Sequence, residues 1–155
     1  MRIVIVEDHQ MFREVIHKVC VDDFGHEVVG EAGEPQPTIL LVEDQEMVRN
    51  TLMLLLKSEG HQVIAAANAD EALPCLQSAE NHVVLVIADL GLPGMDGIEL
   101  IEVARRARPG LAALALSEIT GMERIPDVRL LSKPMTRPAL VEAVQQALRT
   151  ARQER

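Results

Sequence analysis

Aromatic residues are almost missing from this chain of 155 residues, which contains no Trp, no Tyr and only two Phe. Residues of the hydrophobic class nevertheless make up 48% of the sequence, so the interior must consist of Leu, Val, Ile, Ala and Met. An aliphatic interior of this kind suits a buried parallel sheet that is covered by helices. The length favours one domain with a modest additional segment.

Cysteine and positive charge are also scarce. Cys20 and Cys75 lie far apart without the spacing of a metal site, which favours reduced thiols in a cytoplasmic protein. The formal net charge of −9 argues against nucleic acid or an anionic membrane as a direct partner. No apolar stretch approaches the length of a membrane span, and the first apolar run, at residues 3–6, is too short for a signal peptide.

The beginning of the chain resembles the segment that follows it. Residues 3–8 read IVIVED and residues 39–44 read ILLVED; FGHEVV at 24–29 corresponds to EGHQVI at 59–64. The offset falls from 36 residues in the first pair to 35 in the second, so the first copy contains one additional residue. The similarity then stops.

These observations divide the chain into three parts. We expect a partial βαβ fragment at residues 1–34, a stiff linker at 35–37, where the sequence reads PQP, and a complete domain at 38–155.

Short apolar runs alternate with helical patterns after the linker. The apolar runs predict five strands, at 39–43, 62–66, 83–88, 111–116 and 128–131. The periodic segments predict helices at 45–58, from Asn68 onwards, at 97–107, between Ser117 and Asp127 if the space suffices, and from about Thr136 onwards. Pro74 should kink or shorten the second helix. Strict alternation predicts a parallel sheet with right-handed crossovers and helices on both faces.

The predicted strands end in residues that can carry chemistry. Glu43 and Asp44 follow the first strand, Asp89 the third, Ser117 the fourth and Lys133 the fifth. Ligands of an open parallel sheet bind at the carboxyl ends of its strands, so we expect these side chains to converge. Three converging carboxylates need a cation, and Mg²⁺ fits because it prefers oxygen ligands. A carboxylate can then accept a phosphoryl group, whose oxygens a lysine and a hydroxyl can bind.

Four segments carry a resemblance to a known family. They read ILLVED at 39–44, IADLGLPGMDG at 87–97, ALS at 115–117 and LLSKP at 130–134. Together and in this order they resemble the receiver domain of bacterial two-component response regulators. The resemblance implies a flavodoxin-like α/β fold, a three-layer sandwich around a doubly wound parallel sheet of five strands in the order 2-1-3-4-5.

The resemblance also implies the function. Asp89 would be the phosphoacceptor, and its donor would be a phosphohistidine on a sensor kinase or a phosphotransfer protein. Glu43 and Asp44 would hold Mg²⁺ directly or through water, together with Asp89 and the backbone carbonyl of Gly91. The chain would relay a signal by switching partner binding, with no enzymatic activity beyond phosphoryl transfer to its own aspartate and hydrolysis of the product.

The remaining roles follow the same resemblance. Ser117 would bind a phosphoryl oxygen, Lys133 would pair with the phosphate, and Pro134 would follow a cis peptide bond. Leu130 departs from the family, because receivers often place Tyr or Phe there as part of a coupled aromatic switch.

Two alternatives remain open at this point. A haloacid-dehalogenase-type enzyme also uses an aspartyl nucleophile and Mg²⁺, but it places a second aspartate where this chain has Gly91. A pure binding module would have lost phosphorylation, and the N-terminal fragment could cause this by disturbing the strand before Glu43.

The N-terminal fragment has three conceivable structural fates. It can be disordered, pack as an additional strand and helix, or replace residues 39–64 in the sheet of its own or another chain. Replacement would promote a domain-swapped homo-oligomer, and Glu7 and Asp8 could then compete with Glu43 and Asp44 for the metal corner. We expect no second site in the fragment itself, because it carries no counterpart of the later acceptor aspartate.

Overall fold

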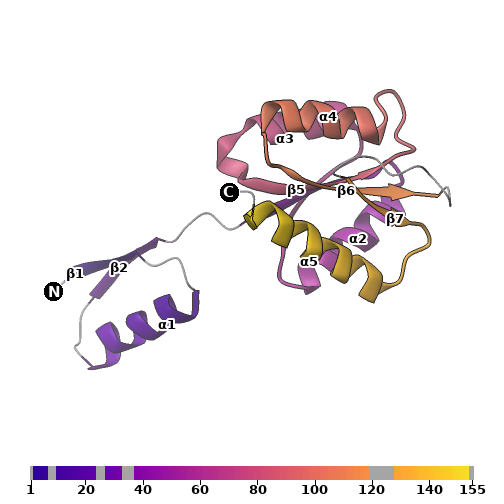
Figure 1. Ribbon diagram of the computed structural model, residues 1–155. Coiled ribbons are helices and arrows are strands. Elements are labelled where there is room, and N and C mark those ends of the chain that lie inside the picture. Colours follow the sequence, from indigo (N-terminus) through magenta and orange to yellow (C-terminus); the bar gives the residue numbers. More distant parts are fainter. Residues whose placement is uncertain (1, 7–9, 24–26, 33–36, 119–127, 154–155) are drawn as a thin grey trace. The chain divides into compact units, whose positions relative to one another are not determined.

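Strands and helices alternate along the chain in the computed structural model, which describes residues 2–6, 10–23, 27–32, 37–118 and 128–153 (Figure 1). The chain divides into two compact units, Met1–Gln36 and Pro37–Arg155. No described helix is both long enough and apolar enough to cross a membrane.

The N-terminal unit contains one parallel strand pair. Strand β1 (Arg2–Val6) pairs with β2 (Glu27–Ala32), and helix α1 (Gln10–Lys18) connects them together with a π-helical turn at Val19–Asp23. A π turn accommodates one more residue than an α turn. This π turn lies between residues 3–8 and residues 24–29, the interval in which the N-terminal copy contains one residue more than the second copy.

The C-terminal unit contains a sheet of five parallel strands. These are β3 (Thr38–Val42), β4 (Gln62–Ala66), β5 (Val83–Asp89), β6 (Ala112–Ser117) and β7 (Arg129–Ser132). Their spatial order is β4-β3-β5-β6-β7, which is the order 2-1-3-4-5 within this unit. The sequence-based prediction of the sheet is confirmed, with strand ends that differ by at most one residue.

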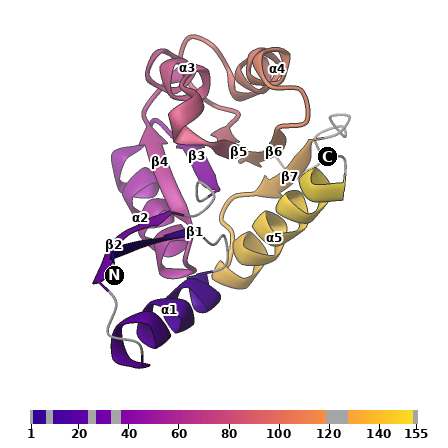
Figure 2. The ribbon, with the colours of Figure 1, turned by 90° about the vertical axis from the view of Figure 1, so that its left-hand side faces the viewer.

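Among the described residues, four α-helices cover the two faces of this sheet. Helices α3 (Ala69–Gln77) and α4 (Gly97–Ala107) lie on one face, while α2 (Glu46–Ser58) and α5 (Arg137–Gln153) lie on the other (Figure 2). The predicted three-layer sandwich is therefore confirmed. The fourth helix of the prediction falls on residues 119–127, outside the described residues.

Strand β3 contributes to both halves of the core. Leu40 and Val42 join the cluster beneath α3 and α4, whereas Ile39 and Leu41 join the cluster beneath α2 and α5. Successive side chains of a strand point to opposite faces, so a strand covered on both faces needs an uninterrupted apolar run. This explains why residues 39–42 of β3 are all apolar.

Helix α3 begins with a pair of reciprocal bonds. The Asn68 side chain accepts a hydrogen bond from the Glu71 backbone N–H at 3.0 Å, and the Glu71 carboxylate accepts one from the Ala67 N–H at 2.8 Å. Such caps satisfy N–H groups that have no partner inside the helix. Pro74 lies within α3, which has only nine residues and ends at Gln77.

Candidate phosphoacceptor site

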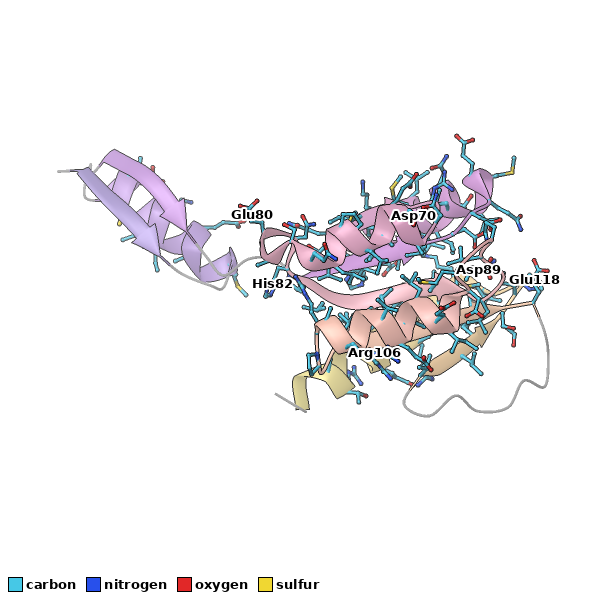
Figure 3. All side chains as sticks on the ribbon, turned by 90° about the horizontal axis from the view of Figure 1, so that it is seen from above. Asp70, Glu80, His82, Asp89, Arg106 and Glu118 are labelled. Atoms are coloured by element: carbon cyan, nitrogen blue, oxygen red, sulfur yellow. The ribbon has the colours of Figure 1, made fainter. Side chains whose placement is uncertain are left out.

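The site lies where the strand order reverses. From β3 the chain first runs to β4 on one side and then to β5 on the other, so the carboxyl ends of β3 and β5 are neighbours. Glu43 and Asp44 follow β3 directly, and Asp89 is the last residue of β5. Ligands of open α/β sheets bind at such a reversal. Figure 3 shows Asp89 and Glu118 at this end of the unit.

Three carboxylates converge here as the sequence predicted. Oxygen atoms of Glu43, Asp44 and Asp89 all lie within 4.8 Å of one another. Glu43 is fully buried and Asp89 is 5% exposed, whereas Asp44 faces the solvent. A compact donor set made only of carboxylate oxygens fits Mg²⁺, which prefers hard oxygen ligands and retains some of its waters.

Lys133 supplies a positive charge to this cluster. Its Nζ lies 2.7 Å from Glu43 Oε2 and 3.2 Å from Asp89 Oδ2. The Lys133 backbone N–H also donates to the Ser117 carbonyl at 2.7 Å, which joins the ends of β6 and β7. The bond between Lys133 and Pro134 is cis, as expected. Ser117 ends β6 and is buried.

Each oxygen of the two buried carboxylates, Glu43 and Asp89, has a partner within the protein. Glu43 Oε1 accepts a hydrogen bond from the Gln45 N–H at 3.2 Å, while its Oε2 pairs with Lys133. Asp89 Oδ1 accepts from the Gly91 N–H at 3.2 Å, and its Oδ2 faces the same lysine. These contacts fix the orientation of both carboxylates.

Burial and ion pairing shift the pKa values of Glu43 and Lys133 in opposite directions. Burial raises the pKa of Glu43 above its usual 4.5, although the bonds from Lys133 and the Gln45 N–H oppose the shift and the Asp89 charge adds to it. Burial alone would lower the pKa of Lys133. The hydrogen bond to Glu43 and the charges of both carboxylates outweigh it and raise that pKa above its usual 10.5.

An open groove adjoins Asp89 through Lys133, which contacts both. It has a volume of about 570 Å³ and lies between α2 and the turn after β7. Its lining is mostly apolar and consists of Met47, Val48, Thr51, Leu52, Glu118, Lys133, Pro134 and Met135. Nothing in the sequence pattern indicates that Met47 and Met135 line a common groove, so this groove was missed.

The first residue of α4 is required for the site and was also missed. A Cβ atom on Gly97 would lie 2.2 Å from the Asp89 carbonyl oxygen and 2.8 Å from its carbon. Only glycine therefore permits α4 to begin this close to the end of β5. In the sequence, Gly97 only marks the start of a predicted helix. The available signal was its position directly after Asp96, whose side chain caps α4 by accepting a hydrogen bond from the Glu99 N–H at 2.9 Å.

Arg49 is a second residue that the sequence analysis missed. Its Nη1 donates to the carbonyl oxygens of Glu43 at 2.8 Å and Asp44 at 3.2 Å. The pattern of α2 places this arginine among its polar positions, and nothing in the spacing indicates a contact with the strand end.

Comparison with known proteins identifies the family. A family model described as response regulator receiver domain matches residues 39–145. The chain belongs to this family. It is a receiver domain of two-component response regulators and therefore a signalling domain. A dehalogenase-type enzyme, which Gly91 already disfavoured, is excluded as the family of this chain.

Several curated relatives resemble a large part of the chain. Response regulator protein FleR of Pseudomonas aeruginosa is 34% identical over 112 residues, which cover 68% of this chain and 23% of FleR. Transcriptional regulatory protein AruR of the same species is 31% identical over 125 residues, covering 75% of this chain and 51% of AruR. The chain thus spans at most about half the length of these relatives.

Solved structures agree with this assignment. The signal receiver domain of an HD domain-containing protein from Pseudomonas fluorescens Pf-5 is 32% identical, with a TM-score of 0.69 over 76% of this chain and 98% of that one. The receiver domain of the hybrid histidine kinase CckA is also 32% identical, with a TM-score of 0.64 over 72% of this chain and 98% of that one.

We predict that Gly97→Ala destabilises the chain by about 1–3 kcal/mol, the usual cost of forcing additional atoms into a packed position. The added methyl must displace either α4 or the end of β5. Urea unfolding followed by circular dichroism measures the loss. Gly91→Ala is the matched control, because its Cβ would lie 3.7 Å from the nearest Asp89 oxygen and needs no shift. Equal losses in the two variants would contradict the steric account.

A second prediction concerns pH in the absence of metal. Because the folded-state pKa of Glu43 is raised, its protonation favours the folded state; this contribution is fully present below pH 4.5 and is lost as the pH rises through the folded-state pKa. The unfolding free energy of Glu43→Gln minus that of the wild type should therefore increase from about pH 4 to about pH 7. Urea unfolding at several pH values measures this difference. A decrease would mean that the Lys133 ion pair outweighs burial.

Proposed function

We propose that Asp89 of this receiver domain accepts a phosphoryl group from a phosphohistidine on a sensor kinase or a phosphotransfer protein. A carboxylate oxygen of Asp89 attacks phosphorus, the bond between phosphorus and the imidazole nitrogen breaks, and the nitrogen keeps the electron pair. The observation that carries the proposal is the convergence of Asp89 with two further carboxylates and Lys133 at the strand reversal.

The residues around Asp89 have separate tasks in this reaction. Lys133, already 3.2 Å from Asp89 Oδ2, would pair with the transferred phosphoryl group, and Ser117 would bind one of its oxygens. Asp44, Asp89 and the Gly91 carbonyl would hold Mg²⁺. Glu43, which lies in the same cluster of carboxylates, would take part directly or through a water. Bound Mg²⁺ would neutralise charge on the phosphoryl oxygens.

The groove is the proposed docking place of the donor. A partner helix that carries the phosphohistidine could place apolar side chains along Met47 and Met135. Lys133 belongs to both the groove and the acceptor site, so such a partner would present its histidine close to Asp89. The same chemistry then limits the signal, because the acyl phosphate on Asp89 would be hydrolysed within the domain. We propose that this phosphoryl relay, and the change in partner binding that it controls, operate in the cytoplasm.

We also propose domains at residues 1–34 and 38–155, joined by a linker at 35–37. The N-terminal segment would exchange with residues 39–64, because β1 and β2 form a parallel pair joined by a helix as β3 and β4 do. Exchange between two chains produces a swapped dimer at little energetic cost.

The acceptor role predicts that Asp89→Ala and Asp89→Asn lose the response to beryllofluoride, a phosphoryl mimic, in the presence of Mg²⁺. Amide NMR and thermal unfolding are suitable measurements, since the chain contains no Trp or Tyr for fluorescence. The wild type should gain about 2.7 kcal/mol at a hundredfold excess over Kd. Asp70→Asn, an exposed aspartate on α3, is the matched control. A response that persists in Asp89→Ala would overturn the proposal.

Exchange of the N-terminal segment predicts dimers that form with increasing concentration in light scattering. Val4→Pro should abolish them, because proline removes a backbone donor from β1. A wild-type chain that stays monomeric at high concentration contradicts the exchange but leaves the acceptor role intact.

A further inference from the structure

Arg49 is the second cation at the acidic corner, and its contacts go to the backbone. The side chain belongs to the first half of α2 and is partly buried. Its Nη1 donates to the carbonyl oxygens of two successive residues, Glu43 at 2.8 Å and Asp44 at 3.2 Å. One guanidinium thus covers both carbonyls at the point where the chain leaves β3.

Three backbone N–H groups of this corner also have partners. The Glu43 N–H donates to the Ala66 carbonyl at 3.1 Å, and the Arg49 N–H donates to the Gln45 carbonyl at 2.8 Å. Gln45 also donates its N–H to the Glu43 carboxylate at 3.2 Å. Together with the two hydrogen bonds from Arg49 Nη1, these bonds hold the turn from β3 into α2. Without Arg49, two carbonyls beside the carboxylates would have to find water instead.

Asp44 depends on this turn more than its two neighbours do. Lys133 holds the Glu43 and Asp89 carboxylates. In the part of the chain that the structure describes, no hydrogen bond or ion pair holds the exposed Asp44 carboxylate. The position of that carboxylate is therefore set by the backbone on which it stands, and Arg49 binds this backbone.

We propose that Arg49 is a positioning residue of the metal corner, which holds the Glu43–Asp44 backbone so that the Asp44 carboxylate is preorganised for Mg²⁺. This inference rests on the proposed Mg²⁺ site. Preorganisation improves Mg²⁺ binding because the coordinating carboxylate does not have to be ordered when the ion binds. Arg49 acts through Asp44 and does not itself contact the metal.

An effect of the Arg49 charge alone would change the Mg²⁺ affinity in the opposite direction. A guanidinium near the corner repels a divalent cation, so its removal alone should strengthen Mg²⁺ binding. Loss of the backbone contacts should weaken Mg²⁺ binding. The direction of change in Arg49→Met therefore separates the two effects, and Arg49→Lys isolates geometry because it leaves the charge unchanged.

The experiment is a Mg²⁺ titration of the full chain, followed through the amide NMR signals of residues 89–91. We expect Mg²⁺ binding about tenfold weaker in Arg49→Met and about threefold weaker in Arg49→Lys than in the wild type. Arg106→Met removes the same charge from an exposed position on α4 and should bind Mg²⁺ like the wild type. Thermal unfolding without metal, measured in parallel, shows whether each variant is folded.

Each outcome of the titration either supports or overturns the positioning role of Arg49. Unchanged or tighter Mg²⁺ binding by folded Arg49→Met overturns the positioning role. If Arg49→Met does not fold, Arg49→Lys decides: weaker binding supports the role, and wild-type binding overturns it. A wild-type chain that does not bind Mg²⁺ overturns the proposed metal site and this inference with it. Normal wild-type binding together with normal binding by Arg49→Met overturns this inference alone.

Discussion

The repulsion among three carboxylates at one sheet edge is the constraint on which the rest of the site depends. The parallel sheet brings Glu43, Asp44 and Asp89 together because β3 and β5 are neighbours and end on the same side. Like charges at this separation oppose folding unless cations compensate them. Lys133, which follows the end of β7, compensates part of this charge through its contacts with Glu43 and Asp89. The remaining negative charge favours a divalent cation at the same corner.

The parts of this account that follow from chain topology could be predicted from the sequence. Aliphatic runs alternating with helical patterns identify the strands, and a parallel sheet brings all their carboxyl ends to one edge. Asp89, Lys133 and the Glu43–Asp44 pair are predicted to lie together on this ground, and the distances confirm their convergence. The order of the strands followed from the family resemblance, because periodicity alone does not rank the positions of strands in a sheet.

The missed residues depend on three-dimensional contacts that leave little trace in sequence patterns. Gly97 is needed because a backbone carbonyl lies where its Cβ would be, and a helix-starting glycine is common without such a contact. Arg49 binds two backbone carbonyls, and polar helix positions usually face solvent. The groove forms between α2 and the turn after β7, segments far apart in the chain. The expected fourth helix lies outside the described residues and stays a prediction.

Chemical trapping of the acyl phosphate tests the central claim most directly. The chain is incubated with Mg²⁺ and a small phosphodonor such as phosphoramidate, reduced with borohydride, digested and analysed by mass spectrometry. Borohydride converts an aspartyl phosphate into homoserine, which marks the residue that carried the phosphoryl group. The account predicts Mg²⁺-dependent conversion at Asp89 alone. Conversion at Asp44 or at another carboxylate, or no conversion in a folded chain that binds Mg²⁺, would contradict it.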